Sequence, residues 1–174
     1  ADCLNTLWRA LLRDEAAEGF VASAVALHDA EDVVHPLELR VFAHGLIDHA
    51  AVQLPVLPLA HRHSRFFAGH YLDEFAEAHG RALVVRQTVG AGLPFAGVGC
   101  AIRREALARL AAMRGGAPFD ADSLVEDYEL GLTLATMGMP ARLMRIAEAP
   151  GGPPVAVRAY FPDRIDAAVR QKAR

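Results

Sequence analysis

Hydrophobic residues along the chain follow two spacings, one typical of helices and one typical of short buried strands. Apolar side chains at helical spacing open the chain, followed by Gly19 as a suitable stop, and they are Leu4, Leu7, Trp8, Leu11 and Leu12. The same spacing predicts helices over 36–47, 66–79, 105–113, 126–137 and 163–174. Short apolar runs predict strands over 20–27, 51–59, 98–102 and 141–146. Because helices alternate with strands, we expect one α/β domain.

Two segments are harder to assign from this pattern. The run 51–59 contains Pro55 and Pro58. Its strand should lie at a sheet edge or end early, because proline cannot donate a hydrogen bond to a ladder. The run 81–89 fits either an extension of the preceding helix or a strand. The segment 149–154 is rich in proline and glycine, which predicts a loop.

Three carboxylates, those of Asp29, Glu31 and Asp32, follow the strand predicted over 20–27. Open α/β sheets bind ligands at the carboxyl ends of their strands. Asp29 and Glu31 are two residues apart, so an extended backbone would point both into the same space. Such a pair of hard oxygen donors suits Mg²⁺ or Mn²⁺. The alternative is a solvated turn before the next helix, with Asp32 or His35 near its cap.

Three other segments carry candidate chemistry. Acids between 122 and 130 begin a predicted helix, where they either stabilise its positive dipole end or supply a general base that faces the same cleft as the acidic pair. His61 and His63 have a spacing that can bind metal, but without a third ligand nearby a solvated loop is the better interpretation. Four glycines within 90–99 match neither a dinucleotide-binding pattern nor a P-loop, which argues against a dinucleotide or ATP cradle.

Composition narrows the class of protein. The 174 residues are 53% hydrophobic and 22% charged, which fits one packed globular domain. The net charge is −3 and no basic run occurs, so we do not expect nucleic acid as a partner. Cys3 and Cys100 lack the spacing of a disulfide framework or a zinc site, which favours reduced thiols in a cytosolic compartment. No apolar stretch reaches about eighteen residues, so we do not expect this segment to cross a bilayer.

Five short motifs occur in order along the chain. Residues 1–5 (ADCLN) match a K-A-D-x-L-N motif without its lysine, and residues 29–31 (DAE) correspond to D-x-D with Glu as the second acid. Residues 95–98 (FAGV) correspond to F-x-G-S with Val for Ser, and residues 125–127 (VED) correspond to T-E-D with Val for Thr. Residues 171–174 (QKAR) match the beginning of Q-x-x-R-W. Together they resemble family 2 glycosyltransferases of the processive, membrane-associated kind that includes cellulose and hyaluronan synthases.

The resemblance implies a GT-A fold, a Rossmann-like α/β architecture in which helices flank a mixed sheet. The family's first strands would precede Ala1, so residues 1–174 are expected to be a single partial catalytic domain cut from a longer membrane protein. Segments 28–36 and 94–99 look most like the bacteriophage-adsorption protein B group of bacterial inner-membrane glycosyltransferases. That similarity implies a location at the cytoplasmic face of the inner membrane, an outer-membrane partner, and regulation by cyclic di-GMP outside this segment.

On the donor side, the resemblance implies binding of a UDP-sugar. Asp29 and Glu31 would hold Mg²⁺ or Mn²⁺ against the diphosphate. Gln171 and Arg174 would contact the diphosphate and the acceptor end, and Asp2 would lie on the nucleotide side.

On the acceptor side, the resemblance implies inverting transfer to a glycan for cell-surface or exopolysaccharide synthesis. Asp127 would be the base that deprotonates the acceptor hydroxyl, and Glu126 would orient it or bind the acceptor. Phe95 and Gly97 would form the acceptor floor, where an aromatic face and a bare backbone suit a sugar ring.

Two other functions remain open. A catalytically degenerate transferase fold would act as a phage-receptor or assembly scaffold, which the substitutions at Glu31, Val98 and Val125 favour. Five polar groups kept at the motif positions favour the enzyme instead, and they are Asp29, Glu126, Asp127, Gln171 and Arg174. A metal-dependent phosphohydrolase would need a second metal site or a nucleophile followed by a backbone nest, and the sequence contains neither pattern. We expect little or no transferase activity from these 174 residues alone, because the predicted nucleotide pocket lies mostly upstream.

Overall fold

The computed structural model describes the whole chain except residues 1, 61–63, 122, 124, 163 and 173–174. Its α-helices are α1 (Asp2–Glu18), α2 (Glu38–Asp48), α3 (Arg65–Glu77), α4 (Leu83–Thr88), α5 (Arg104–Met113), α6 (Glu126–Thr136) and α7 (Ile165–Lys172). Its strands are β1 (Ala24–Leu27), β2 (Ala51–Gln53), β3 (Val56–Leu59), β4 (Cys100–Arg103), β5 (Ala141–Leu143) and β6 (Val157–Tyr160). A π-helical segment, η1 (Ala78–Ala82), joins α3 to α4.

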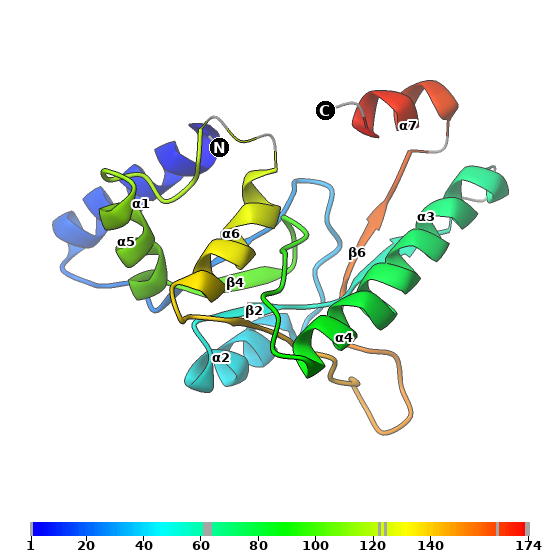
Figure 1. Cartoon of the computed structure of the whole chain (residues 1–174), viewed down its shortest axis with the longest axis horizontal. Coiled ribbons are helices and arrows are strands. Elements are labelled where there is room, and N and C mark those ends of the chain that lie inside the picture. The colour runs from blue at the N-terminus through cyan, green and yellow to red at the C-terminus, as the bar shows by residue number, and fades with distance from the viewer. Residues whose placement is uncertain (1, 61–63, 122, 124, 163, 173–174) are drawn as a thin grey trace.

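The larger sheet has four strands in the order β1-β4-β2-β5, and β2 and β4 lie at its centre (Figure 1). Strand β4 runs antiparallel to both β1 and β2, whereas β2 runs parallel to β5. Strands β3 and β6 form a separate parallel pair. The predicted α/β fold with a mixed sheet flanked by helices is therefore confirmed.

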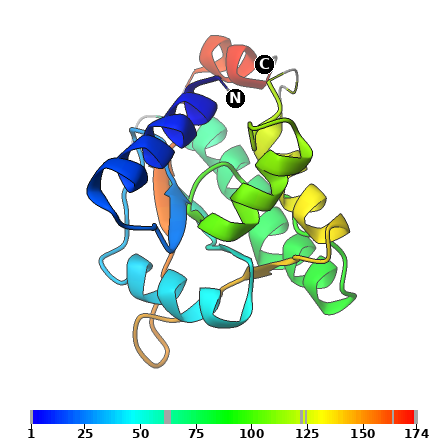
Figure 2. The ribbon, with the colours of Figure 1, turned by 90° about the vertical axis from the view of Figure 1, so that its left-hand side faces the viewer.

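Helices cover both faces of the larger sheet. Successive residues of a strand point to opposite faces, so each strand contributes apolar side chains to both layers. Ala51 and Ile102 belong to the buried cluster that includes side chains of α1, α5 and α6, whereas Val52 and Ala101 belong to the cluster beneath α2. Figures 1 and 2 show α2 on the opposite side of the sheet from α1 and α5. The two clusters place the sheet between two apolar layers.

The expected single strand over 51–59 is wrong in the structure. The segment contains two strands, β2 and β3, which belong to different sheets. Pro55 between them has no N–H, so it cannot continue the ladder of β2, and its carbonyl instead accepts a hydrogen bond from the Val157 N–H at 3.0 Å. Strand β2 does end early, as the prolines predicted, but it lies inside the larger sheet and not at its edge.

The other elements follow the predictions with shifted ends. The run 81–89 continues the helical path of α3 through η1 into α4 and forms no strand. The predicted strand over 20–27 is paired only from Ala24 onward, and β6 was not predicted. In the part of the chain that the structure describes, no helix is both long and apolar enough to span a membrane.

Candidate functional site

The three clustered carboxylates lie in the loop that follows β1, which we call the acidic loop (residues 28–32). His28 lies between two carboxylates: its Nδ1 is 3.1 Å from Asp32 Oδ2 and its Nε2 is 2.6 Å from Glu38 Oε1. The side chains of Asp32 and Glu38 are only 2% and 1% exposed. Asp32 Oδ2 also accepts a hydrogen bond from the Asp29 N–H at 2.9 Å. Buried polar groups therefore hold the backbone of the acidic loop.

Asp29 and Glu31, by contrast, are exposed. The pKa of Asp29 is raised, first by loss of hydration and then by the negative charges of Glu31, Asp32 and Asp127. The three carboxylates do follow strand β1, as the sequence predicts, but they differ in role: Asp32 supports the loop, while Asp29 and Glu31 are exposed. Asp32 does not cap the next helix, which begins at Glu38.

The second part of the site is the segment 95–99 before β4, which we call the glycine loop. Gly97 has a φ of +77°, and a Cβ atom at this position would lie 2.6 Å from Asp127 Oδ2. Any side chain here would therefore combine an unfavourable backbone conformation with a clash. The backbone of the glycine loop lies directly against the Asp127 carboxylate.

Asp127 lies in the first turn of α6, and Gly131 lets that helix approach the chain before the glycine loop. A Cβ atom at Gly131 would collide with the Leu93 carbonyl oxygen. Burial raises the pKa of Asp127, although hydrogen bonds from backbone N–H groups, including Tyr128 N–H to Oδ1 at 2.8 Å, oppose part of this change. The charge of Asp127 also raises the pKa of Asp29 and, after burial itself, that of the Cys100 thiol. Two of the sequence motifs, far apart in the chain, therefore lie within electrostatic reach of each other.

One detail of the predicted acceptor floor is wrong. Phe95 is only 3% exposed, and its side chain belongs to the buried cluster that also contains Leu130 and Leu134 of α6. Its aromatic face therefore packs against apolar side chains and is not open to a sugar ring. The motif pattern suggested an aromatic platform, but an aromatic residue beside a buried strand is also typical of a core position.

The remaining predicted site residues lie in different parts of the chain. Glu126 is half-buried in the first turn of α6, next to Asp127. Asp2 is exposed in the first turn of α1. Gln171 belongs to α7, but its side chain lies outside the described part of the structure, as do Arg174, His61 and His63. Their roles stay predictions.

The start of α1 is tied to the segment that leads into α6. Asn5 is buried, its Nδ2 donates to the Phe119 carbonyl at 2.7 Å, and its Oδ1 accepts from the Phe119 N–H at 3.1 Å. The asparagine of the first sequence motif thus has a structural role in this chain. It fixes the chain that approaches Asp127 from the N-terminal side.

Among the described residues, no group of three or more His, Cys, Asp or Glu side chains is arranged to hold a metal ion. Asp29 and Glu31 nevertheless offer two carboxylates whose negative charges act on each other. A divalent cation would relieve that repulsion, and hard oxygen donors are the ligands that Mg²⁺ and Mn²⁺ prefer. The donor set therefore fits a cation whose other ligands come from phosphate and water.

Sequence reasoning missed the side chains that support the two loops. His28 at the start of the acidic loop contacts Glu38 of α2, and Gln53 contacts the glycine loop with its side chain fully buried. A signal for Gln53 was present, because it is the one polar residue in the apolar run 50–60. A polar residue inside such a strand is costly unless it is hydrogen-bonded, and it therefore indicates a specific partner.

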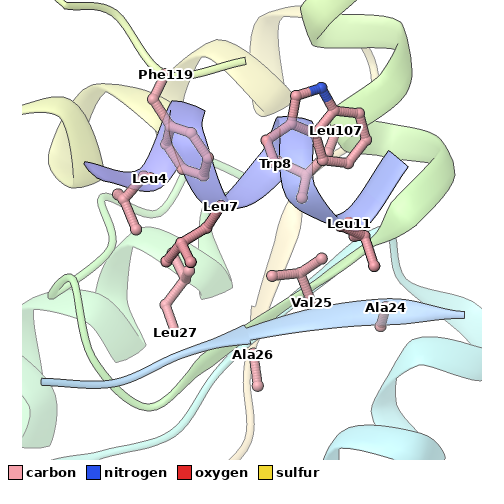
Figure 3. Close-up of a pocket in the computed structure, with 10 residues that line it drawn as sticks. All are labelled: Leu4, Leu7, Trp8, Leu11, Ala24, Val25, Ala26, Leu27, Leu107 and Phe119. Carbon is pink, nitrogen blue, oxygen red and sulfur yellow. The ribbon is translucent and has the colours of Figure 1, made fainter. Parts of the chain in front are cut away.

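A separate pocket of about 330 Å³ lies between α1 and β1. Figure 3 shows leucines of α1 pointing toward β1 on its floor, with Leu107 and Phe119 completing the lining. The residues that line it include no acid and no base. It therefore offers none of the charges that a nucleotide diphosphate would require, and it is not part of the candidate site.

Comparison with known proteins agrees with the resemblance to family 2 glycosyltransferases. A family model described as "Glycosyl transferase family group 2" matches residues 24–174. Bacteriophage adsorption protein B of Escherichia coli strain K12 is 36% identical over 189 aligned residues, which cover 100% of this chain and 25% of the relative. Bacteriophage N4 adsorption protein B of Escherichia coli O157:H7 matches with the same identity and coverage. The chain thus spans about a quarter of the length of these relatives. On the match over 24–174, this chain belongs to glycosyltransferase family group 2, and the family implies the GT-A fold.

Proposed function

We propose that this chain is the catalytic part of an inverting, metal-dependent glycosyltransferase that moves a sugar from a UDP-sugar to a glycan acceptor. Membership of glycosyltransferase family group 2 supports the reaction class. The observation that carries the proposal is the contact of the glycine loop with Asp127, whose charge also reaches Asp29. A base, a bare backbone surface and a pair of metal-binding acids thus share one region.

On the donor side, Asp29 and Glu31 bind Mg²⁺ or Mn²⁺ through their exposed carboxylates. The cation, when bound, neutralises the negative charge that develops on the leaving diphosphate. The partly buried His28 side chain and the buried Asp32 and Glu38 side chains hold the acidic loop so that the two ligands face the same substrate. Further donor contacts are assigned to Asp2, Gln171 and Arg174, and a guanidinium is well matched to phosphate oxygens.

On the acceptor side, Asp127 takes the proton of the acceptor hydroxyl. The hydroxyl oxygen forms its bond to the anomeric carbon from the side opposite the diphosphate, while the bond from that carbon to the diphosphate oxygen breaks, so the configuration inverts. Burial raises the pKa of Asp127, which makes the carboxylate a stronger base than an exposed aspartate. Glu126 orients this base or binds the acceptor, and Gly97 with the Phe95 backbone lines the acceptor side.

The parent protein is proposed to work at the cytoplasmic face of the bacterial inner membrane, in cell-surface or exopolysaccharide synthesis. Its partners would be the UDP-sugar, the glycan acceptor and an outer-membrane protein, with cyclic di-GMP acting outside this segment. Nucleic acid is not a proposed partner. The 174 residues alone are expected to show little or no turnover.

The test uses the full-length parent protein in membranes. Release of UDP from a panel of UDP-sugars is measured with Mn²⁺ or Mg²⁺, with and without cyclic di-GMP, for the wild type, Asp127→Asn and the exposed control Asp14→Asn. Turnover of one sugar that is lost in Asp127→Asn and kept in Asp14→Asn is the expected result. If no donor turns over while the protein still binds its partners, the scaffold function, which the substitutions at Glu31, Val98 and Val125 favour, replaces the enzyme.

A further inference from the structure

We infer that Gln53 is a positioning residue, which holds the glycine loop at the distance from Asp127 that acceptor binding requires. The inference rests on the proposed function, because it assigns a role within that site. Gln53 is the last residue of β2, and its side chain is 0% exposed. It contacts the loop from below, on the side away from solvent.

Both ends of the Gln53 amide bind the glycine loop. Its Oε1 accepts a hydrogen bond from the Ala96 N–H at 3.1 Å. Its Nε2 lies within hydrogen-bond distance of the carbonyl oxygens of Val98 (2.9 Å), Leu54 (2.9 Å) and Gly99 (3.2 Å), so its two hydrogens are shared among three acceptors. Only this orientation of the amide matches donors with acceptors, because the opposite orientation would place its oxygen against three carbonyls.

The residues that Gln53 binds lie on both sides of Gly97. The Ala96 N–H belongs to the peptide unit 95–96 and the Val98 carbonyl to the unit 98–99, so the amide holds the loop one peptide unit away from Gly97 on each side. Gly97 itself lies against the Asp127 carboxylate. Gln53 of β2 and Asp127 of α6 therefore contact the same short loop at neighbouring residues.

The end of the loop is held by the backbone instead. The Gly99 carbonyl accepts from the Leu54 N–H at 2.8 Å, and the Gly99 N–H donates to the Leu27 carbonyl at 3.0 Å. Gly99 therefore has sheet-like contacts that would persist without Gln53. The Ala96 N–H depends on the side chain, so removal of the amide should release the part of the loop that contacts Asp127.

The positions of the two loops predict which substrate loses binding or reactivity when the Gln53 amide is removed. The glycine loop lies on the side of the base, whereas the acidic loop is held separately by His28, Asp32 and Glu38. Loss of the amide should therefore weaken acceptor use and leave donor binding almost unchanged. A residue that merely stabilised the fold would affect both substrates alike.

The experiment compares three variants of the full-length parent protein with the wild type. Gln53→Met keeps the length of the side chain and removes its hydrogen bonds. Gln53→Glu, when protonated, restores one donor and one acceptor. Gln87→Met is the matched control, because Gln87 Oε1 accepts a backbone hydrogen bond from the Leu143 N–H at 2.8 Å, away from the glycine loop.

Two readouts are taken for each variant. The first is sugar transfer at varied acceptor concentration, together with the KM for the UDP-sugar and its hydrolysis by water. The second is hydrogen–deuterium exchange of a peptide that covers residues 95–99. For Gln53→Met we expect transfer to fall about tenfold or more, since small displacements at a reacting centre are costly. The donor KM should change less than about twofold, exchange of the loop should become faster, and Gln53→Glu should recover part of both effects.

Each outcome decides the inference. Equal losses for donor and acceptor, or a result for Gln53→Met that matches Gln87→Met, would overturn it. If the wild type turns over no donor, the proposed function fails, but exchange of residues 95–99 still tests the positioning role, and unchanged exchange in Gln53→Met would refute it. If Gln53→Met does not fold, the test uses Gln53→Glu. Weaker transfer with an unchanged donor KM and faster exchange of residues 95–99 would support the inference, and wild-type values or equal losses for donor and acceptor would refute it.

Discussion

The two loops that form the candidate site are supported in chemically different ways. The acidic loop is held by an ionisable network, in which His28 lies between the buried carboxylates of Asp32 and Glu38. The glycine loop is held by a neutral amide, that of Gln53. The Gln53 side chain is fully buried, whereas the His28 ring is partly exposed between its two buried carboxylates. Each support contacts groups immediately beside a predicted site residue.

The difference matches the substrates proposed for each side. A diphosphate and a divalent cation carry large charges. The charges of an ionisable support beside them therefore change the local electrostatic potential comparatively little. A sugar hydroxyl is neutral, and its base must keep a suitable pKa. A charged support beneath the glycine loop would shift the pKa of Asp127, whereas a neutral amide holds the loop without doing so.

The largest expected effect comes from the base itself. Asp127→Asn removes the proton acceptor and keeps the shape of the side chain. Transfer in the full-length parent should fall by about 10²- to 10⁴-fold, the usual contribution of general-base catalysis. Binding of the UDP-sugar, measured by calorimetry, should persist, and loss of donor binding in this variant would contradict the separation of the two sides.

A second effect tests the contact between the glycine loop and the base. Gly97→Ala places a Cβ atom against Asp127 Oδ2 at a φ of +77°. We expect transfer to fall by about tenfold to hundredfold, because either the loop or the carboxylate must move. The control is Gly80→Ala, where a Cβ atom meets nothing within 4 Å. Equal activity of the two variants would show that the contact is not required.

The charged support gives a third, smaller effect on the donor side. His28→Gln removes the ring that bridges Asp32 and Glu38 and leaves two buried carboxylates without it. The Mn²⁺ concentration for half-maximal UDP release should rise about tenfold, as is typical when support for metal ligands is lost. The acceptor KM should stay nearly constant. A change in acceptor KM without a change in metal dependence would show that the acidic loop serves the acceptor side and not the donor side.

The smallest effect is a dependence on pH. Since burial raises the pKa of Asp127, transfer should decline on acidification at a higher pH than an ordinary aspartate would allow. Stability should change in the opposite direction. Between the unfolded pKa and the raised folded pKa, the folded protein binds more protons, so ionisation of Asp127 lowers stability as pH rises. The Tm of Asp127→Asn should exceed that of the wild type at neutral pH, and the gap should close at acidic pH.

Local patterns in the sequence predicted most helices and the acidic loop. Apolar spacing identified α1, and the charges after an apolar run identified the loop at Asp29. The split of β2 from β3 was not predicted, because Pro55 indicated only that a strand must end and not that the chain enters another sheet. The burial of Phe95 and the hydrogen bonds of Gln53 were not predicted. The apolar run 50–60 indicated only that Gln53 needs a specific partner, and its partner Ala96 lies more than forty residues away in the chain, so no local pattern identifies it.

The contact between Gly97 and Asp127 constrains the design of variants of this chain. A Cβ atom at position 97 would lie 2.6 Å from Asp127 Oδ2 at a φ of +77°, so a side chain there requires the loop or the carboxylate to move. Substitutions that alter the proposed acceptor side and keep this contact are therefore better placed at a neighbour such as Val98, which stands where the resembling motif has serine.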